Sequence, residues 1–182
     1  MNLNEGQNLP HERLTPSPWV VRFAEHISQG GSVLDVACGS GRHSCFLTSR
    51  GHRVDAVDRD GAAFFDIPAG VNFVCADIEL GPWPFAGKCY DGVIVTNYLY
   101  RPLLPLLMES VAPDGLLIYE TFAVGNERYG HPSRPDFLLR PNELVDLVMS
   151  SSANFNVLAF EEKFIENPQP AMVQRIAARL AR

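Results

Sequence analysis

The chain has 182 residues, of which 46% are hydrophobic and 20% charged, and its formal net charge is −6. This length suffices for one sizeable core but leaves little room for a second, so we expect a single domain. The acidic charge provides no general attraction to a phosphate backbone, which weighs against a nucleic-acid partner. The sequence has no apolar run of the roughly twenty residues that a membrane span requires, so we expect no membrane partner.

The N-terminal residues differ in composition from the rest of the chain. Residues 1–16 are polar and contain prolines, and they lack the basic-then-apolar pattern of a signal peptide. We therefore expect a flexible arm, a domain over residues 17–182, and a cytoplasmic location. The cysteines form no C-x-x-C pair and no group with histidine at metal-ligand spacing, so we predict no metal site. They are Cys38, Cys45, Cys75 and Cys89.

Short runs rich in β-branched residues alternate with segments of helical spacing along most of the chain. The runs predict strands at 32–37, 53–57, 71–76, 91–96 and 116–120. The helical spacing predicts helices at 18–27, 42–49, 61–65, 102–111 and 141–150. Two more strands, at 156–160 and 172–178, are joined by a short proline-bearing link, which predicts a hairpin and an antiparallel final strand. Strands separated by helices indicate an α/β fold with a mostly parallel sheet covered on both faces.

The segment Cys38-Gly39-Ser40-Gly41 follows the first predicted strand and precedes a predicted helix. Glycines at such a turn allow the backbone to approach a ligand without a Cβ in the way. The free N–H groups at the start of the helix then face that ligand. The alternative interpretation is a glycine-rich turn that only connects strand to helix, because a lone G-x-G pair is a weak motif.

Polar residues end the next three predicted strands, which strengthens the interpretation as a ligand site. Asp58, Asp77 and Asn97 stand at these positions, and strand ends of a parallel sheet share one edge. Asp35, four residues before Gly39, suits a ligand with a cationic amino group and would repel a pyrophosphate. The dinucleotide fingerprint is also incomplete, because Ser44 stands at its last position, where the fingerprint has glycine or alanine. A dehydrogenase is therefore the weaker interpretation.

The pattern Asp35-x-Ala37-x-Gly39-x-Gly41, followed by Asp58, Asp77 and the 91–97 strand, resembles the class I S-adenosylmethionine-dependent methyltransferases. This resemblance covers about residues 17–122 and implies a Rossmann-like three-layer sandwich, with a mostly parallel seven-stranded sheet whose last strand is antiparallel. It also implies that Asp35 and the Gly39–Gly41 backbone hold the methionine portion of the cofactor. Asp58 would hold the ribose, Asp77 with Ile78 the adenine, and Asn97 would lie near the sulfonium.

The full set of cofactor-binding residues that the resemblance implies is Asp35, Ala37, Cys38, Gly39, Gly41, Asp58, Arg59, Asp77, Ile78 and Asn97. Ala37 departs from the family pattern, which often has glycine there. The form Cys-Gly-x-Gly-Arg-His-Ser is similar to the tellurite- and thiol-type small-molecule methyltransferases. We interpret His43 as a helix-start residue rather than a base.

We expect the methyl acceptor to bind near the ends of the fourth and fifth strands and the long polar segment 123–141. This segment is either a lid or a surface excursion held by salt bridges of Arg128 and Arg134. Methyl transfer depends mainly on alignment, so no catalytic residue is demanded. The candidate acceptor-pocket residues are Tyr98, Tyr100, Arg101, Glu120, Tyr129 and His131.

Three functions remain open from the sequence. The first is a methyltransferase acting on a small molecule, which releases S-adenosylhomocysteine. The second is an RNA or protein methyltransferase with a basic surface built from Arg101, Arg128, Arg134 and Arg140. The third is a non-catalytic module that binds S-adenosylmethionine. Strand four lacks the Asn-Pro-Pro-aromatic turn that resembles enzymes methylating nucleobase or glutamine nitrogens, which disfavours that class of acceptor. No pattern indicates an oligomeric state.

Overall fold

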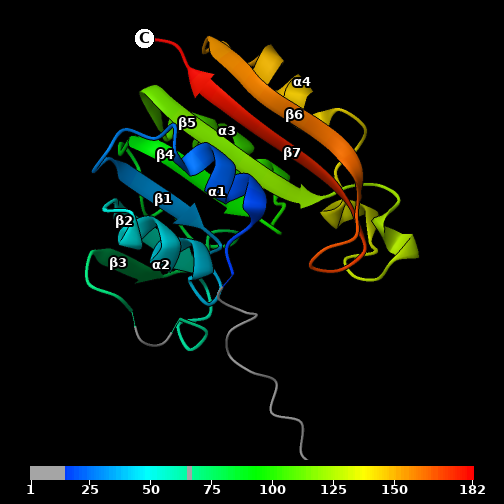
Figure 1. Cartoon of the computed structure of the whole chain (residues 1–182), viewed down its shortest axis with the longest axis horizontal. Coiled ribbons are helices and arrows are strands. Elements are labelled where there is room, and N and C mark those ends of the chain that lie inside the picture. The colour runs from blue at the N-terminus through cyan, green and yellow to red at the C-terminus, as the bar shows by residue number, and fades with distance from the viewer. Residues whose placement is uncertain (1–14, 65–66) are drawn as a thin grey trace, which may run out of the picture.

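The computed structural model describes residues 15–64 and 67–182 and contains one seven-stranded sheet (Figure 1). The strand order is β3-β2-β1-β4-β5-β7-β6. The strands are β1 (Ser32–Val36), β2 (Arg53–Asp58), β3 (Val71–Cys75), β4 (Tyr90–Thr96), β5 (Val111–Phe122), β6 (Phe155–Ile165) and β7 (Ala171–Leu180). Strands β1 to β5 pair in parallel, and β7 lies antiparallel between β5 and β6. The predicted sheet, including its antiparallel last strand, is confirmed.

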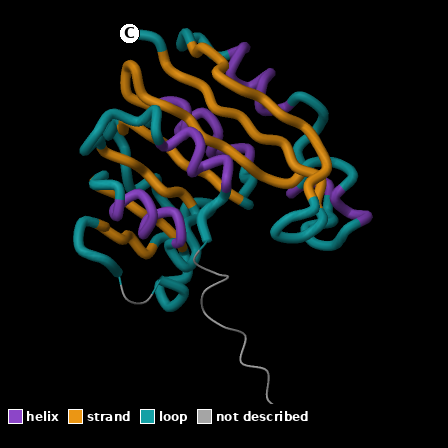
Figure 2. Tube along the Cα trace, in the orientation of Figure 1, coloured by secondary structure: helices purple, strands orange, loops and turns teal. Residues whose placement is uncertain are grey.

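Helices cover both faces of the sheet, as the tube in Figure 2 shows. The α-helices are α1 (Pro18–Ala24), α2 (Arg42–Ser49), α3 (Leu104–Glu109) and α4 (Glu143–Ser150), with short 3-10 turns at Arg101–Leu103, Asn126–Arg128 and Pro135–Phe137. Helices α1 and α2 contribute to one buried cluster, and α3 and α4 contribute to a second. The architecture is therefore a three-layer sandwich.

The strands divide their side chains between these two clusters because successive residues of a strand point to opposite faces. On β1, Val33 packs with α1 and α2, whereas Leu34 packs with α3 and α4. On β4, Ile94 belongs to the first cluster and Val95 to the second. Each such buried side chain stabilises the fold by about 1.5–3 kcal/mol. Both faces of the central strands are apolar for this reason.

Helix α1 is shorter than the predicted 18–27 helix. The Ser17 Oγ accepts a hydrogen bond from the Trp19 N–H and so caps its start. The helix ends at Ala24, after which the N–H groups of His26 and Ile27 donate to carbonyls three residues back. These tighter bonds satisfy the last carbonyls of the helix without continuing it.

The predicted helix at 61–65 is wrong over its described residues, 61–64, which form turns; residue 65 lies outside the described part of the chain. The carboxylate of Asp60 accepts the Ala62 N–H, and the Asp60 carbonyl accepts the Ala63 N–H. This local turn competes with a helix. It places Phe64, only 2% exposed, edge-on against Phe73.

The remaining differences concern element boundaries. The predicted helix 102–111 is a 3-10 turn followed by α3, because Val111 already pairs with Tyr90 of β4. Strands β5, β6 and β7 are longer than predicted, since they pair with one another along most of their length. Of the predicted arm over residues 1–16, residues 1–14 lie outside the described part of the chain. Among the described helices, none is long and apolar enough to cross a membrane.

Candidate functional site

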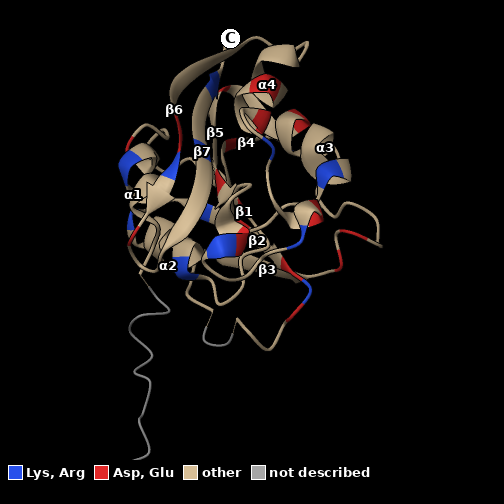
Figure 3. Cartoon of the chain, turned by 90° about the vertical axis from the view of Figure 1, so that its right-hand side faces the viewer, with Lys and Arg blue, Asp and Glu red and all other residues tan. Residues whose placement is uncertain are grey.

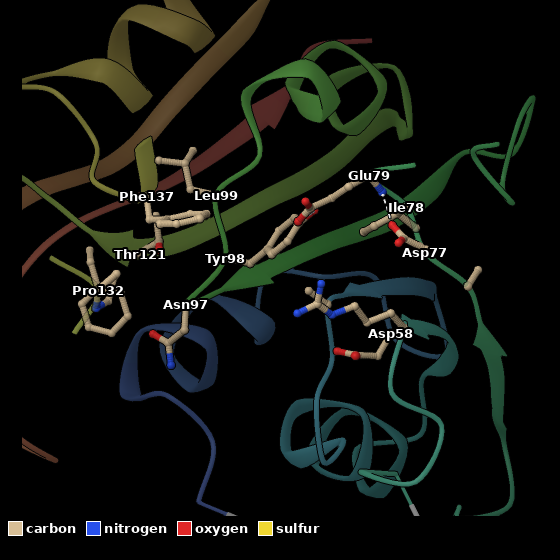
Figure 4. Close-up of a pocket in the computed structure, with 14 residues that line it drawn as sticks. Asp58, Asp77, Ile78, Glu79, Asn97, Tyr98, Leu99, Thr121, Pro132 and Phe137 are labelled. Carbon is tan, nitrogen blue, oxygen red and sulfur yellow. Dashed lines mark hydrogen bonds between the residues drawn. The ribbon is translucent and has the colours of Figure 1, made fainter. Parts of the chain in front are cut away.

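A cavity of about 440 Å³ opens at the carboxyl ends of the parallel strands (Figure 4). We refer to it as the first cavity. Figure 4 shows Asp58, Asp77 and Ile78 on one side, Pro132 and Phe137 on the other, and Asn97 between them. Its lining residues are Ala37, Asp58, Arg59, Ala76, Asp77, Ile78, Glu79, Asn97, Tyr98, Leu99, Thr121, Phe122, Pro132 and Phe137. Six of the predicted cofactor-binding residues therefore meet in one cavity.

The glycine loop after β1 is bonded to the end of β2. The Gly39 N–H donates to Oδ2 of Asp58 at 2.8 Å, and the Gly41 N–H donates to the Cys38 carbonyl. Gly39 and Gly41 both have left-handed backbones, with φ of 55° and 76°. A Cβ at Gly41 would collide with the Phe64 ring, whereas a Cβ at Gly39 would meet nothing within 4 Å. The loop is therefore packed against the Phe64 ring at Gly41, whereas the space beside Gly39 is empty.

Ala37 also has a left-handed backbone, with a φ of 51°. An L-residue in this conformation costs about 1–2 kcal/mol relative to a right-handed one, a cost that glycine does not incur. The geometry therefore explains why glycine suits this position in the pattern that the sequence resembles. Alanine has the smallest side chain that can still replace it.

Asp58 is the last residue of β2, and Asp77 follows the end of β3. Backbone N–H groups donate hydrogen bonds to both carboxylates. The Oδ1 of Asp58 accepts from the Asp60 N–H, while its Oδ2 accepts from Gly39. The Oδ1 of Asp77 accepts from the N–H groups of Glu79 and Leu80, which lowers the pKa of Asp77. Each carboxylate retains acceptor capacity, so each can also bind hydroxyl or amino donors of a ligand.

Asn97 turns the chain sharply at the end of β4. Its φ is 55°, a left-handed conformation that asparagine tolerates better than most residues. Its N–H donates to the Glu120 carbonyl, and its side chain is exposed in the first cavity. Next to it, the Tyr98 hydroxyl donates to Oε1 of Glu79, and burial raises the pKa of Tyr98.

Asp35 lies beneath the loop rather than at the cavity surface. It is 1% exposed, and its Oδ2 accepts a hydrogen bond from the Ser44 hydroxyl at 2.6 Å. Burial raises the pKa of Asp35 from 3.8 to about 6. The buried thiol of Cys38 also has its pKa raised by burial, so it is uncharged. The structure thus places Asp35 behind the loop backbone that it was predicted to assist.

His43 is buried in the first turn of α2. Its Nε2 accepts the Ser17 N–H at 3.1 Å, so the neutral ring carries its proton on Nδ1, which lies 3.3 Å from the Thr96 hydroxyl. Burial lowers the pKa of His43 to about 3. The ring joins the residues before α1 to the first turn of α2.

Two further cavities adjoin the first one. The second cavity, of about 310 Å³, is lined by Thr15, Pro16, Ser17, Pro18, Arg42, Asn97, Glu120, Phe122, Ile165, Asn167, Pro168, Gln169, Ala171, Val173 and Arg175. The third cavity, of about 690 Å³, is lined by Ala37, Cys38, Gly39, Ser40, Arg42, Thr96, Asn97, Pro168 and Gln169. Asn97 lines all three.

Of the candidate acceptor residues, some line a cavity, and others contact other parts of the chain or are exposed. Tyr98 lines the first cavity, and Glu120 lines the second. The Tyr100 hydroxyl donates to the Glu79 carbonyl, and the Tyr129 ring packs at a tilt against the Phe164 ring, at a centroid distance of 4.8 Å. His131 is exposed.

Arg101 holds the 123–141 segment from below. Its guanidinium forms a bidentate ion pair with Glu143 and donates to the carbonyls of Asp136 and Leu138, which flank Phe137. The segment in turn contributes Pro132 and Phe137 to the first cavity. Arg134, one of the two residues predicted to hold a surface excursion, forms an ion pair with Asp136 and lies over the ring of Phe137, both inside the segment.

Sequence reasoning missed Arg42 and Arg175 as lining residues. Arg42 follows Gly41 directly, so its place at the start of α2 was a usable signal. Arg175 lies on β7 and reaches the second cavity through the pairing of β7 with β5. No local motif marks such a residue.

Both signs of charge are distributed through the chain, as Figure 3 shows for one side.

A family model described as tellurite resistance protein TehB matches residues 11–70. The structure is similar to TehB from Haemophilus influenzae, with a TM-score of 0.69 and 20% identity over 88% of this chain. This chain spans 61% of the length of that protein. A methyltransferase from Methanosarcina mazei gives a TM-score of 0.68 and 17% identity, covering 92% of this chain and 99% of the other.

A third similar structure is the 1,6-didemethyltoxoflavin-N1-methyltransferase of Burkholderia thailandensis, with bound 1,6-didemethyltoxoflavin and S-adenosylhomocysteine. It gives a TM-score of 0.66 and 19% identity, covering 91% of this chain and 78% of the other. No curated protein sequence matches the chain.

Proposed function

We propose that this chain, which has the fold of the class I S-adenosylmethionine-dependent methyltransferases, transfers a methyl group from S-adenosylmethionine to a small molecule. One observation carries the proposal. Asp58, Asp77 and Asn97, from three consecutive strand ends, line one cavity of about 440 Å³ beside the glycine loop. That volume lies in the range typical of cofactor sites.

The residues of the first cavity fit the parts of this cofactor. Asp58 would accept hydrogen bonds from the ribose hydroxyls, and Asp77 with the Ile78 backbone would bind the edge of the adenine. The open space at Gly39 leaves room for the methionine portion against the loop backbone. Asn97, which lines all three cavities, would lie where the methionine portion meets the acceptor.

The chemistry supplied by bound S-adenosylmethionine is a methyl group on positively charged sulfur, open to in-line attack. The chain's own contribution is then to align the acceptor and to exclude water. Leu99, Phe122, Pro132 and Phe137 form an apolar wall at one end of the first cavity, which serves the second task. A nucleophile that carries no proton needs no base from the protein.

A small acceptor is supported by the size of the cavities and by the charge of the chain. The second cavity, next to Asn97, measures about 310 Å³, which is enough for a small organic molecule. The net charge of −6 disfavours a polyanionic acceptor. The methyltransferase from Burkholderia thailandensis that shares the fold binds 1,6-didemethyltoxoflavin.

Calorimetric titration of the purified chain with S-adenosylmethionine tests the proposal. We expect one binding site per chain and an affinity at least about tenfold lower in Asp58→Asn, because hydrogen bonds to a carboxylate are worth about 1.5–3 kcal/mol. Asp60→Asn is the matched control. Asp60 lies two residues further on and is exposed, and among the described residues its side chain accepts a hydrogen bond from the Ala62 N–H within the local turn. Absence of binding by the intact chain, or equal affinities of the two variants, would contradict the proposal.

A further inference from the structure

Three charged residues line the second cavity. It is lined by two guanidinium groups, Arg42 and Arg175, and by one carboxylate, Glu120. Among the lining residues the arginines outnumber the carboxylates by two to one, and a further carboxylate, that of Glu161, lies 3.7 Å from Nε of Arg175. Glu120 and Arg175 are each 9% exposed, so these charges face the cavity rather than bulk water. Charges in such a place interact more strongly with a ligand than surface charges do.

The carboxylate of Glu120 has one hydrogen bond and one ion pair within the described chain. Its Oε1 accepts a hydrogen bond from the Ser17 hydroxyl at 2.7 Å, and its Oε2 lies 3.3 Å from Nε of Arg175. The Ser17 bond ties the residues before α1 to β5. The contacts of Glu120 therefore stabilise the fold, and Glu120 does not require a cationic ligand as a partner.

Arg175, in contrast, has unused hydrogen-bonding capacity. Its Nε lies near carboxylate oxygens of Glu120 and Glu161, at 3.3 Å and 3.7 Å, but forms a hydrogen bond with neither. Within the described chain, its terminal nitrogens donate no hydrogen bond either; the guanidinium lies over the Trp19 ring at 5.4 Å. Both ion pairs of Arg175 involve its Nε, so its terminal N–H groups remain available to a ligand. The planar fork of such a group matches a carboxylate in two parallel hydrogen bonds.

The rest of the lining suits an organic body rather than a bare inorganic anion. Phe122, Ile165 and Val173 are apolar, and prolines come from both the segment before α1 and the turn between β6 and β7. A hydrated inorganic ion would leave these apolar side chains in contact with water, whereas the carbon skeleton of an organic acid would cover them. The cavity also meets the first and third cavities at Asn97, the residue assigned above to the reacting end of the cofactor.

We propose that the methyl acceptor is an organic molecule with a carboxylate group, and that Arg175 binds this carboxylate in the second cavity. This inference rests on the proposed function. Arg42 lines both the second and the third cavity, and its side chain forms no hydrogen bond or ion pair with any described residue. It is therefore available to the carboxylate of the cofactor as well, whereas Arg175 lines only the second cavity and discriminates between the two roles.

Ligand-observed NMR with benzoate, on protein saturated with S-adenosylhomocysteine, tests this assignment. Benzamide has the same shape without the charge, and inorganic phosphate has the charge without the organic body. We expect benzoate to bind at least about tenfold more tightly than benzamide and than phosphate, in line with the strength of charge-assisted hydrogen bonds. Phosphate binding as tight as benzoate would overturn the organic class of ligand, and benzamide binding as tight would overturn the carboxylate.

Two variants locate the effect. Arg175→Gln removes the guanidinium and should abolish benzoate binding, while Arg175→Lys keeps a positive charge beside Glu120, preserves the fold, and should weaken binding by losing the planar fork. Arg179→Gln is the matched control. Arg179 lies on the same face of β7 and forms an ion pair with Asp114 outside the cavity. Equal benzoate affinities in Arg175→Lys and Arg179→Gln would overturn the role of Arg175.

The same samples separate this inference from the proposed function. Binding of S-adenosylhomocysteine that stays unchanged in Arg175→Lys supports the assignment of Arg175 to the acceptor, and a matched loss of both ligands contradicts it. Benzoate binding that depends on Arg175, in a chain that binds no S-adenosylhomocysteine, overturns the proposed function and leaves the ligand class of the cavity standing.

Discussion

Asp35 illustrates how a single buried residue couples the glycine loop to pH. Its carboxyl group is 1% exposed and bonded to Ser44, and burial raises its pKa from 3.8 to about 6. Between these two values the native carboxyl group holds a proton that the unfolded chain has lost. The native state is therefore favoured at low pH, and this contribution to stability disappears as the pH rises through 6.

Replacing Asp35 with asparagine removes the ionisable group and keeps an acceptor for the Ser44 hydroxyl. We expect the free energy of unfolding of Asp35→Asn, relative to the unchanged chain, to rise by up to about 3 kcal/mol between pH 4 and pH 7. His43, whose pKa is lowered to about 3, makes a contribution to stability that rises with pH. This contribution is the same in both proteins and cancels in the comparison. Urea unfolding at several pH values measures the difference, and a difference independent of pH would contradict the assignment.

The left-handed backbone at Ala37 gives a second prediction at this scale. Ala37→Gly removes the cost of the left-handed conformation but adds flexibility to the unfolded chain, for a net gain of about 0.5 kcal/mol in the free energy of unfolding. Gly41→Ala is the opposite test, because its Cβ would collide with Phe64, and we expect a loss of at least about 2 kcal/mol. Thermal unfolding measures both; a destabilised Ala37→Gly variant would refute the argument from backbone strain.

Arg101 acts at the scale of an element, because it fixes one segment to another. Its four hydrogen bonds join the 3-10 turn Arg101–Leu103 to Glu143 at the start of α4 and to two carbonyls of the 123–141 segment. The ion pair is partly buried, with side-chain exposures of 29% and 18%. Such a pair holds its partners more firmly than an exposed one does. The wall formed by Phe137 and Pro132 therefore depends on Arg101.

Arg101→Gln should release this wall. We expect faster hydrogen exchange over residues 132–139 and a loss of about 1–2 kcal/mol in the free energy of unfolding, since charge-assisted hydrogen bonds are lost. The matched control is Arg134→Gln, in the same segment, whose ion pair with Asp136 is exposed. Hydrogen exchange with mass spectrometry compares them. If both variants accelerate exchange equally, the segment is held by something other than Arg101.

At the scale of the whole molecule, the sheet and the first cavity followed from the sequence, because both depend on local patterns. Apolar runs identify buried strands, and the ends of parallel strands meet at one edge by geometry alone. The depth of Asp35 did not follow, because a motif gives the order of residues and not their burial. Arg175 and the second cavity were missed because they arise from the pairing of β7 with β5, across more than fifty residues of sequence.

The position of β7 within the sheet also bears on how the chain folds during synthesis. This strand is made after both β5 and β6, yet it lies between them in the sheet. While the ribosome still holds residues 171–180, β5 has an unpaired side and β6 has no neighbour to which it can bond. Unpaired strand edges invite pairing with other chains. The nascent chain therefore stays vulnerable to aggregation until β7 emerges and pairs with both strands.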